Sequence, residues 1–386
     1  MSTGPTPGPT PGPGLGLGLI ETQRVVLDGP LRLAGGAVLR DVEVAYQTYG
    51  RLSAARDNVV VLCHALTGDA HAAGHHGDPA RRGWWDNLVG PGRAVDTDRF
   101  FVVSSNLLGG CQGTTGPQSI DPATGAAYGP DFPLLTVSDL VLVQRRLLER
   151  LGLGRVHAAV GGSLGGMQVL QWAIDAPGQL ERAVVVAASS LLSAENIALS
   201  AVARHAITGD ADFCGGRYAE HGRRPDHGLA VARRLAHVGY VSEQLLEDKF
   251  GRRRLDDGPP RLGTDFQVES YLDHQAAVFL ERFDALTYLH LTRVMDYFDP
   301  FADPAAAERL RAGGTRFEVV SFDSDRRFPT AHSARIHAHL VAAGVASEHT
   351  DLASAYGHDS FLLAPPGYHE LVRASLDRER AITSAG

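Results

Sequence analysis

The fold of this chain is decided by one stretch, which reads Val156-His157-Ala158-Ala159-Val160-Gly161-Gly162-Ser163-Leu164-Gly165-Gly166-Met167-Gln168-Val169-Leu170. Its centre fits the pattern GxSxG, in which a serine stands on a sharp turn between a strand and a helix. An apolar run precedes Ser163, and residues 167–175 follow it with helical periodicity. This setting favours a nucleophile turn over an incidental serine in a glycine-rich loop.

Such a turn has a built-in donor for negative charge. The helix after the serine directs its N-terminus at the hydroxyl, so the amide of Leu164 is placed to stabilise an oxyanion. A serine hydroxyl is a weak nucleophile and needs a base. In folds with this turn, an acidic residue and then a histidine follow the serine along the chain.

Candidates for both partners lie downstream. A strand is predicted over residues 317–322, and Asp323 and Asp325 both stand just past its end. His358 lies near the C-terminus, in a loop before a helix-like run. The chain has 17 histidines, so a histidine at this place is weak evidence by itself. Spacing does not separate the two aspartates, and the residues alone leave the acid open.

The rest of the chain extends the same architecture. Strands are predicted over residues 38–47, 59–63, 100–104, 156–160, 183–187 and 317–322, and a helix over 137–151. Strands that alternate with helices predict an α/β fold with a mostly parallel central sheet. With the serine turn at its centre, this is the α/β-hydrolase fold.

The alternation stops between residues 191 and 312, where the pattern is mostly helical and rich in charge. An insertion at this point predicts a helical lid over the ends of the strands. We therefore expect a disordered Gly/Pro tail over 1–19, a first part of the core over 20–190, the lid over 191–312, and a second part of the core over 313–386.

Composition excludes several classes of function. A net charge of −8 offers no basic face for nucleic acid, and no apolar run approaches the roughly 20 residues needed to span a membrane. Three widely spaced cysteines predict a reduced, cytoplasmic protein. The histidines at 64, 71, 75 and 76 lack cysteine or carboxylate neighbours at a metal-binding spacing. We expect them to form a polar loop at the rim of the site, without a metal.

Further blocks are more specific than GxSxG. They are Cys63-His64-Ala65-Leu66-Thr67-Gly68-Asp69-Ala70-His71, Asn106-Leu107-Leu108-Gly109-Gly110-Cys111-Gln112-Gly113-Thr114-Thr115-Gly116-Pro117, Phe266-Gln267-Val268-Glu269-Ser270-Tyr271-Leu272 and Gly357-His358-Asp359. With Gly161–Gln168, they make residues 40–371 resemble the homoserine O-acyltransferase family, and its acetyltransferases most closely.

The resemblance implies roles for particular residues. The acid of the family stands in a Ser-Asp pair ahead of a Phe-Pro step, here Ser324-Asp325-Arg326-Arg327-Phe328-Pro329, which selects Asp325. The resemblance also implies that His358 is the base and that the amide of Leu66 is the second oxyanion donor. It further implies that Arg233 binds the carboxylate of homoserine, with Tyr240 and Asp359 nearby. Arg234 is adjacent to Arg233 and is the alternative cation for this role.

The function expected from these features is transfer of an acetyl group from acetyl-CoA to the hydroxyl of L-homoserine, through an acyl-serine on Ser163, in methionine biosynthesis. Acetyl-CoA is then a co-substrate, no cofactor is needed, and a homodimer is expected. The alternatives are the same triad with succinyl-CoA, L-serine or a β-lactam alcohol as donor or acceptor, and a serine esterase. A non-catalytic scaffold is disfavoured by the intact Ser163, Asp325 and His358.

Overall fold

The computed structural model describes residues 17–377. Nearly all of the predicted Gly/Pro tail, 1–19, lies outside these residues. Its last three residues are described, and Leu19 forms a β-bridge with His75. The amide of Ile20 then donates a hydrogen bond to the carbonyl of His75 at 3.0 Å, which attaches the start of the described chain to the core.

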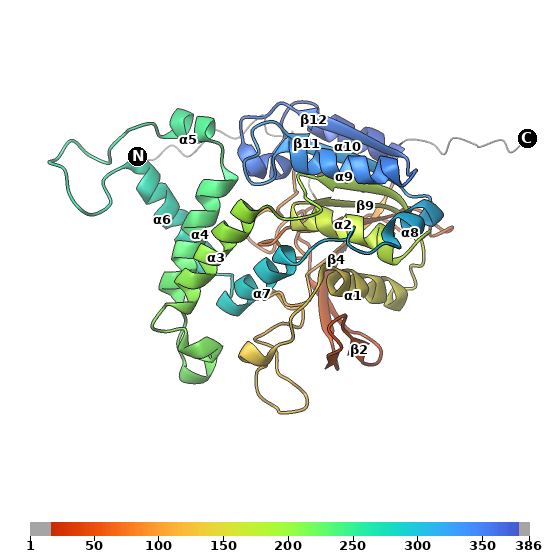
Figure 1. The fold of residues 1–386 in the computed structure, drawn as a ribbon, viewed down its shortest axis with the longest axis horizontal. Helices are drawn as coiled ribbons and strands as arrows, with labels where there is room; N and C mark the ends of the chain where they lie inside the picture. The colour runs from red at the N-terminus through yellow and green to blue at the C-terminus, as the bar shows by residue number, and fades with distance from the viewer. Residues whose placement is uncertain (1–16, 378–386) are drawn as a thin grey trace, which may run out of the picture.

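A central eight-stranded sheet organises the molecule (Figure 1). In spatial order its strands are β1 (Gln23–Val26), β4 (Glu43–Tyr49), β8 (Phe101–Ser105), β5 (Val59–Cys63), β9 (Val156–Gly162), β10 (Leu180–Val186), β11 (Arg316–Phe322) and β12 (Ser347–Leu352). The pairings of β1 with β4 and of β4 with β8 are antiparallel, and the strands from β8 to β12 are parallel. The predicted mostly parallel sheet is confirmed.

Strand β5 is buried on both faces, as its continuous apolar run predicts. Val59, Val61 and Cys63 belong to one hydrophobic core, and Val60 and Leu62 belong to the other. Successive side chains of a strand point to opposite faces, so the two cores lie on the two sides of the sheet.

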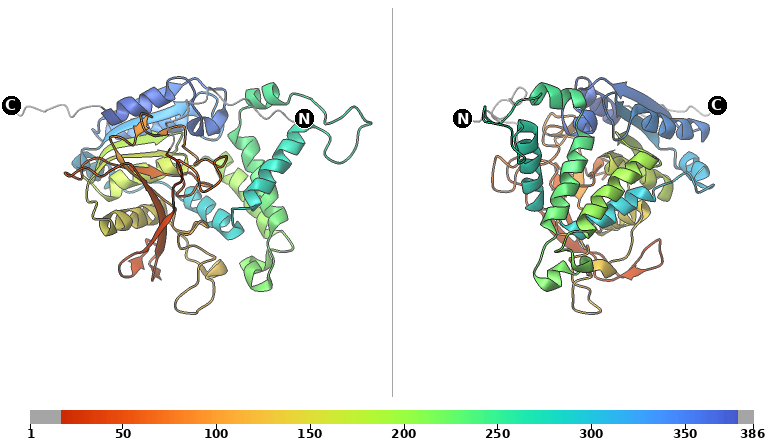
Figure 2. Two further views of the ribbon diagram at one scale, coloured as in Figure 1. Left: turned by 180° about the vertical axis from the view of Figure 1, so that it is seen from behind. Right: turned by 60° about the vertical axis from the view of Figure 1, so that its left-hand side comes forward.

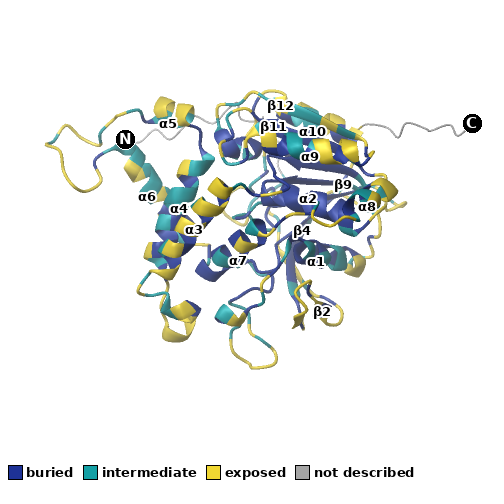
Figure 3. Ribbon diagram, in the orientation of Figure 1, coloured by how far each residue is buried: buried dark blue, intermediate teal, exposed yellow. Residues whose placement is uncertain are grey.

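Helices cover both sides of the sheet, as Figures 2 and 3 show. The first core contains apolar side chains of α1 (Val137–Arg150), α2 (Leu164–Asp175), α8 (Ala306–Gly313) and α9 (Thr330–Ala342). The second core contains those of α10 (Tyr368–Asp377) and of the segment between β5 and β8. Figure 3 shows the sheet and α2 as the most deeply buried part of the chain.

The early strand predicted over residues 38–47 is divided in the structure. It forms β3 (Val38–Leu39), which pairs with β2 (Leu31–Arg32), and then β4. The division falls at Asp41, whose φ of 51° turns the chain out of the extended conformation. The sequence does not predict strand β12, because its residues SEHTDL are polar and it lies at the edge of the sheet. Three short elements lie between β5 and α1 in addition to β8: β6 (Val89–Gly90), β7 (Val95–Asp96) and the 3-10 helix η1 (Gly129–Asp131).

A group of helices fills the interval between β10 and β11 and stands beside the sheet (Figure 1). They are α3 (Ala194–Thr208), η2 (Cys214–Gly216), η3 (Tyr218–His221), α4 (Asp226–Tyr240), α5 (Glu243–Lys249), α6 (Gln267–Leu280) and α7 (Ala285–Asp296), and together they are called the lid below. Helix α4 contacts η4 (Gly357–Leu362), the last 3-10 helix of the described chain. Within residues 17–377, no helix is long and apolar enough to cross a membrane.

Candidate active site

Ser163 occupies a strained turn between β9 and α2. Its φ of 58° and ψ of −123° lie outside the regions that non-glycine residues favour. The neighbouring glycines allow the turn to exist: a Cβ on Gly165 would lie 1.9 Å from the carbonyl oxygen of Cys63, and one on Gly162 would lie 2.3 Å from the Phe361 ring. The backbone of α2 therefore packs directly on the end of β5.

The structure brings the three predicted triad residues into contact. His358 Nε2 lies 2.9 Å from Ser163 Oγ, and His358 Nδ1 lies 2.7 Å from Asp325 Oδ2. All three side chains are buried. His358 lies within η4 rather than in the predicted loop. In this geometry the imidazole can take the proton of the serine while the carboxylate stabilises the imidazolium that forms.

Hydrogen bonds distinguish the two candidate aspartates, Asp323 and Asp325. The other oxygen of Asp325, Oδ1, accepts hydrogen bonds from the amides of Arg327 and Phe328, both at 2.8 Å. These bonds fix the carboxylate against the imidazole. Asp323 is exposed, and its Oδ1 accepts from the amide of Ser354 at 2.9 Å. The structure thus places Asp325, and not Asp323, beside His358.

Two main-chain amides near Ser163 are without acceptors in the described part of the chain. Leu164 is the first residue of α2, so its amide precedes the helical hydrogen bonds. Leu66 lies just past the end of β5, is buried, and donates to no group among the described residues. Buried amides are nearly always paired, so these two are available for a ligand such as an oxyanion.

Aromatic rings surround the imidazole of His358. The ring centroids of Tyr240, Phe328 and Phe361 lie 5.6, 5.1 and 5.4 Å from that of His358. Tyr240 is the last residue of α4, so the lid forms one wall of the site. The apolar surroundings limit the access of bulk water to the triad.

A positive and a negative side chain lie beside the triad. Arg233 of α4 stacks on the ring of Phe279, with its Cζ 4.9 Å from the ring centroid, and its buried Nε has no partner among the described residues. Burial raises the pKa of Asp359, while the charges of His358 and Arg233 oppose that shift. The pKa of Tyr271 is likewise raised by burial and responds to both Asp359 and Arg233. The positive charge of Arg233 complements the negative group of a zwitterion, and the carboxylate of Asp359 complements its positive group.

Arg234 turns away from this cluster. Its guanidinium forms an ion pair with Asp273 of α6 at 2.9 Å, near the surface of the lid. Arg233 and Arg234 are consecutive on one helix and so point in directions about 100° apart. Of the two arginines that the sequence leaves open, Arg233 is the one whose charge acts on Asp359, the residue after His358.

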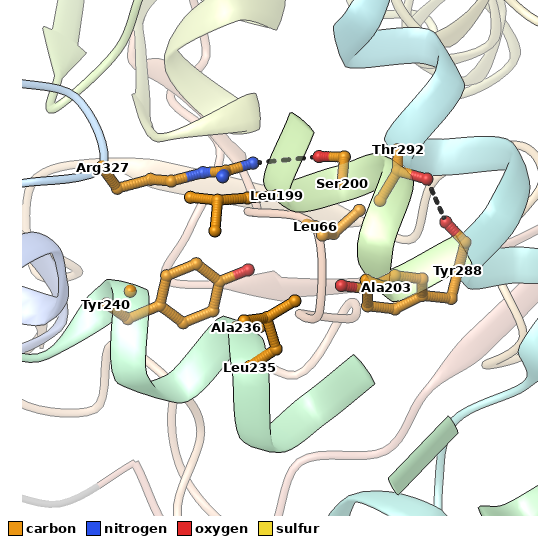
Figure 4. A pocket seen from close by; sticks show the side chains of 11 residues that line it. Leu66, Leu199, Ser200, Ala203, Leu235, Ala236, Tyr240, Tyr288, Thr292 and Arg327 are labelled. Atoms are coloured by element: carbon orange, nitrogen blue, oxygen red, sulfur yellow. Dashed lines mark hydrogen bonds between the residues drawn. The ribbon is translucent and has the colours of Figure 1, made fainter. Parts of the chain in front are cut away.

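A narrow pocket lies among the lid helices, next to Leu66 and Arg327 (Figure 4). Leu66 and Tyr240 line it together with side chains of α3, α4 and α7. Arg327 reaches into it, and its Nη2 donates to Ser200 Oγ at 3.2 Å. In Figure 4 the Tyr240 hydroxyl also points toward the centre of the pocket. The pocket thus combines apolar side chains and hydroxyl groups with one guanidinium.

Sequence reasoning misses several residues that surround the site. Arg327 stands out in the sequence only as part of the motif around Asp325, and its neighbour Arg326 is exposed. His64, Asn106 and Gln168 are fully buried polar residues next to the strand ends. Their position in otherwise apolar or glycine-rich segments is the available signal, because buried polar groups are retained where they form hydrogen bonds.

The fold and the serine–histidine–aspartate geometry define an α/β-hydrolase, and residues 58–362 match the family described as alpha/beta hydrolase fold. A protein of Nocardioides sp. named homoserine O-succinyltransferase is 64% identical over 92% of this chain and 97% of its own length. One from Caulobacter vibrioides named homoserine O-acetyltransferase is 48% identical over 94% and 96% of the two chains. The chain belongs to the homoserine O-acyltransferase family of α/β-hydrolases.

Solved structures give the same picture of the fold. Homoserine O-acetyltransferase from Bacillus anthracis superposes with a TM-score of 0.87 at 27% identity, covering 94% of this chain and 99% of that chain. Esterase E22 superposes with a TM-score of 0.85 at 28% identity, covering 93% and 100%. The same scaffold therefore carries proteins named as transferases and as esterases.

The two aspartates provide a matched test of the triad. Asp325→Asn should slow acylation by p-nitrophenyl acetate by about 10⁴-fold, as the corresponding change does in serine proteases, because the amide favours the wrong imidazole tautomer. Asp323→Asn should leave the rate within about threefold of wild type, because surface changes away from a site have small effects. Stopped-flow release of p-nitrophenol measures both rates. Equal losses in the two variants would contradict the assignment.

Asp359 should destabilise the free protein at neutral pH. Its pKa is raised in the folded state, so its contribution to stability is complete below the unfolded pKa and is lost as pH rises through the folded pKa. The neutral amide of Asp359→Asn cannot ionise, so this variant should raise Tm at pH 8 and have a smaller effect at pH 4. Thermal unfolding at both pH values measures this, with the exposed Asp98→Asn as control. A lower Tm at pH 8 would show that the Asp359 charge stabilises the fold.

Proposed function

We propose that the protein transfers an acyl group from an acyl-CoA thioester to the hydroxyl of L-homoserine, through an ester on Ser163, as a step of methionine biosynthesis. The observation that carries the proposal is the pairing of a complete triad with the oppositely charged side chains of Arg233 and Asp359. The triad supplies nucleophilic chemistry, and the charged pair suits a small zwitterionic acceptor.

In the first half-reaction, Ser163 Oγ attacks the thioester carbonyl while His358 Nε2 takes the hydroxyl proton. The amides of Leu66 and Leu164 stabilise the oxyanion of the tetrahedral intermediate. His358 then returns the proton to the departing thiolate of coenzyme A. Asp325 keeps its charge throughout and holds the imidazolium in place.

In the second half-reaction, homoserine occupies the space that the thiol has left. Its carboxylate pairs with Arg233, and its ammonium group lies near Asp359. The hydroxyl then lies within reach of His358 Nε2, which removes its proton as the oxygen attacks the acyl carbon. Collapse of the second tetrahedral intermediate releases Ser163 and the O-acyl-homoserine.

The charged pair distinguishes transfer from hydrolysis. An esterase would use the same triad with water as acceptor, and esterase E22 has the same fold. Water requires neither a guanidinium nor a carboxylate beside the imidazole, and two charges in a largely apolar site cost desolvation energy. Their presence supports an acceptor that carries both charges.

For the acyl group, the sequence predicts acetyl, but one observation favours succinyl. Arg327 lines the pocket beside Leu66 and Tyr240, and we propose that the acyl chain on Ser163 extends into this pocket. An acetyl group has no charge for this guanidinium to bind, whereas the distal carboxylate of a succinyl group matches it. The 64% identical Nocardioides protein is named a succinyltransferase, which supports the same choice. We therefore propose succinyl-CoA as the preferred donor, with acetyl-CoA as the alternative.

Arg233 should govern the acceptor and leave acylation intact. Arg233→Ala should keep the rapid burst of thiol release from acyl-CoA but raise the KM for homoserine by about 10- to 100-fold, because a charged hydrogen-bonding pair is lost. Arg234→Ala should leave both quantities near wild type, since Arg234 pairs with Asp273 at the surface. Loss of the burst in Arg233→Ala with a normal homoserine KM would move Arg233 to the donor site or to the fold.

The donor is decided by comparing the two thioesters on the wild type and on Arg327→Leu. Wild type should prefer succinyl-CoA over acetyl-CoA by at least about tenfold in kcat/KM, and Arg327→Leu should lose most of that preference. The exposed Arg326→Leu is the control and should keep it. A wild-type preference for acetyl-CoA that Arg327→Leu leaves unchanged would restore the acetyl prediction.

A further inference from the structure

A buried polar network lies between the end of β5 and the start of α2. Its members are His64, Asn106, Gln144 and Gln168, whose side chains are almost completely excluded from solvent. Burying polar groups costs free energy unless each is hydrogen-bonded, so a network at this depth is retained for its bonds. None of its members belongs to the triad or to the charged pair, yet it adjoins both Leu66 and Leu164.

The main-chain neighbours of His64 determine its tautomer. Nδ1 lies 2.8 Å from the carbonyl oxygen of Ala65, which can only accept, so Nδ1 carries the hydrogen. Nε2 lies 3.2 Å from the amide of Leu107, which can only donate, so Nε2 is the acceptor. His64 is therefore neutral, and burial favours that form by lowering the pKa of the imidazole.

This tautomer also orients Asn106. The Asn106 side-chain amide lies 3.1 Å from His64 Nε2 through the atom assigned as Oδ1, while its Nδ2 has no partner among the described residues. An acceptor at Nε2 requires the NH₂ end of Asn106 to face it, and the two ends of an asparagine amide are assigned only from such bonds. With the ends exchanged, Asn106 Nδ2 donates to His64 Nε2, which then shares its one lone pair between Asn106 and the Leu107 amide.

The hydrogen bond that His64 Nδ1 donates to the Ala65 carbonyl fixes the orientation of the Leu66 amide, the oxyanion donor. The carbonyl of Ala65 and the amide of Leu66 belong to one planar trans peptide, so they point in opposite directions. The Ala65 oxygen also accepts from the amide of Gly68 at 3.0 Å. Two donors therefore fix this carbonyl on one side and direct the Leu66 N–H to the other, where it has no acceptor in the described part of the chain.

The side chain of Gln168 connects the main chain of His64 to that of Leu164, the second oxyanion donor. Gln168 Nε2 donates to the carbonyl oxygens of His64 and of Leu164, both at 3.1 Å, and Gln168 Oε1 accepts from Gln144 at 2.8 Å. One side-chain amide thus joins the end of β5 to the first turn of α2. The segment that carries Leu66 is held against the segment that carries Leu164.

We propose that His64 is a positioning residue for acyl transfer: as the neutral Nδ1–H tautomer, it holds the Ala65–Leu66 peptide so that the Leu66 amide faces the developing oxyanion. The inference rests on the proposed function only in that the reaction passes through an acyl-serine. It assigns no direct contact between His64 and the substrate.

Two substitutions of His64 each preserve one of its two hydrogen bonds and remove the other. In His64→Asn, the side-chain NH₂ occupies the place of Nδ1 and keeps the donor to Ala65. In His64→Gln, the longer amide reaches the place of Nε2, keeps the acceptor for Leu107, and loses the donor to Ala65. A structural role in packing would favour the longer glutamine, whereas the proposed role favours asparagine.

Acylation by p-nitrophenyl acetate is the readout, because it needs neither coenzyme A nor homoserine. His64→Gln should lower the acylation rate constant by about 30- to 100-fold, somewhat less than outright loss of an oxyanion donor, with KM within about twofold of wild type. His64→Asn should stay within about fivefold of wild type. Equal rates in the two variants, or a fully active His64→Gln, would overturn the proposal.

A measurement on the wild type keeps the test independent of variant folding. Nitrogen-15 spectra of histidine-labelled protein, with the His64 signal assigned by its absence in His64→Asn, report the tautomer directly. A neutral ring with hydrogen on Nδ1 at pH 7 is expected, and hydrogen on Nε2 would overturn the proposal. A wild type that is acylated by the ester but does not pass the acyl group to homoserine would contradict the proposed function and leave this inference standing.

Discussion

The backbone contact between α2 and β5 is the constraint on which the rest of the site depends. A Cβ on Gly165 would lie 1.9 Å from the carbonyl oxygen of Cys63, so the helix and the strand touch without any intervening side chain. This approach forces Ser163 into its strained turn and brings the start of α2 against the loop His64-Ala65-Leu66, which directly follows β5. The strain persists because β5 and the end of β9, which hold the turn, are buried and closely packed.

The lid also positions residues of the active site, because the end of α4 packs against the segment that carries His358. Gly357, which precedes the catalytic histidine, has a φ of 71°, and a Cβ there would lie 2.6 Å from both the carbonyl of Tyr240 and the amide of Ser242. The end of α4 is therefore packed against the segment that carries His358, and the same helix carries Arg233. Acceptor recognition and placement of the base thus depend on one helix of the lid, so a shift of α4 should affect both.

The parallel sheet is predictable from the sequence because buried parallel strands such as β5 form continuous apolar runs, and the serine turn is predictable because GxSxG lies between a strand and a helix. The polar edge strand β12 and the break at Asp41 escape prediction, because neither gives an apolar period. Spacing alone does not separate Asp323 from Asp325 or Arg233 from Arg234, because only the fold decides which side chain faces the triad. The role of His64 depends on hydrogen-bond direction, which a linear sequence does not contain.

The central claim is that the acyl group resides on Ser163 between the two substrates. The most direct test is mass spectrometry of the protein incubated with succinyl-CoA, or with acetyl-CoA, in the absence of homoserine and then after its addition. We predict one acyl group on the peptide that contains Ser163, absent from Ser163→Ala, and its quantitative transfer to homoserine when the acceptor is added. No adduct on Ser163, together with thiol release that requires both substrates at once, would contradict the account and indicate direct transfer in a ternary complex.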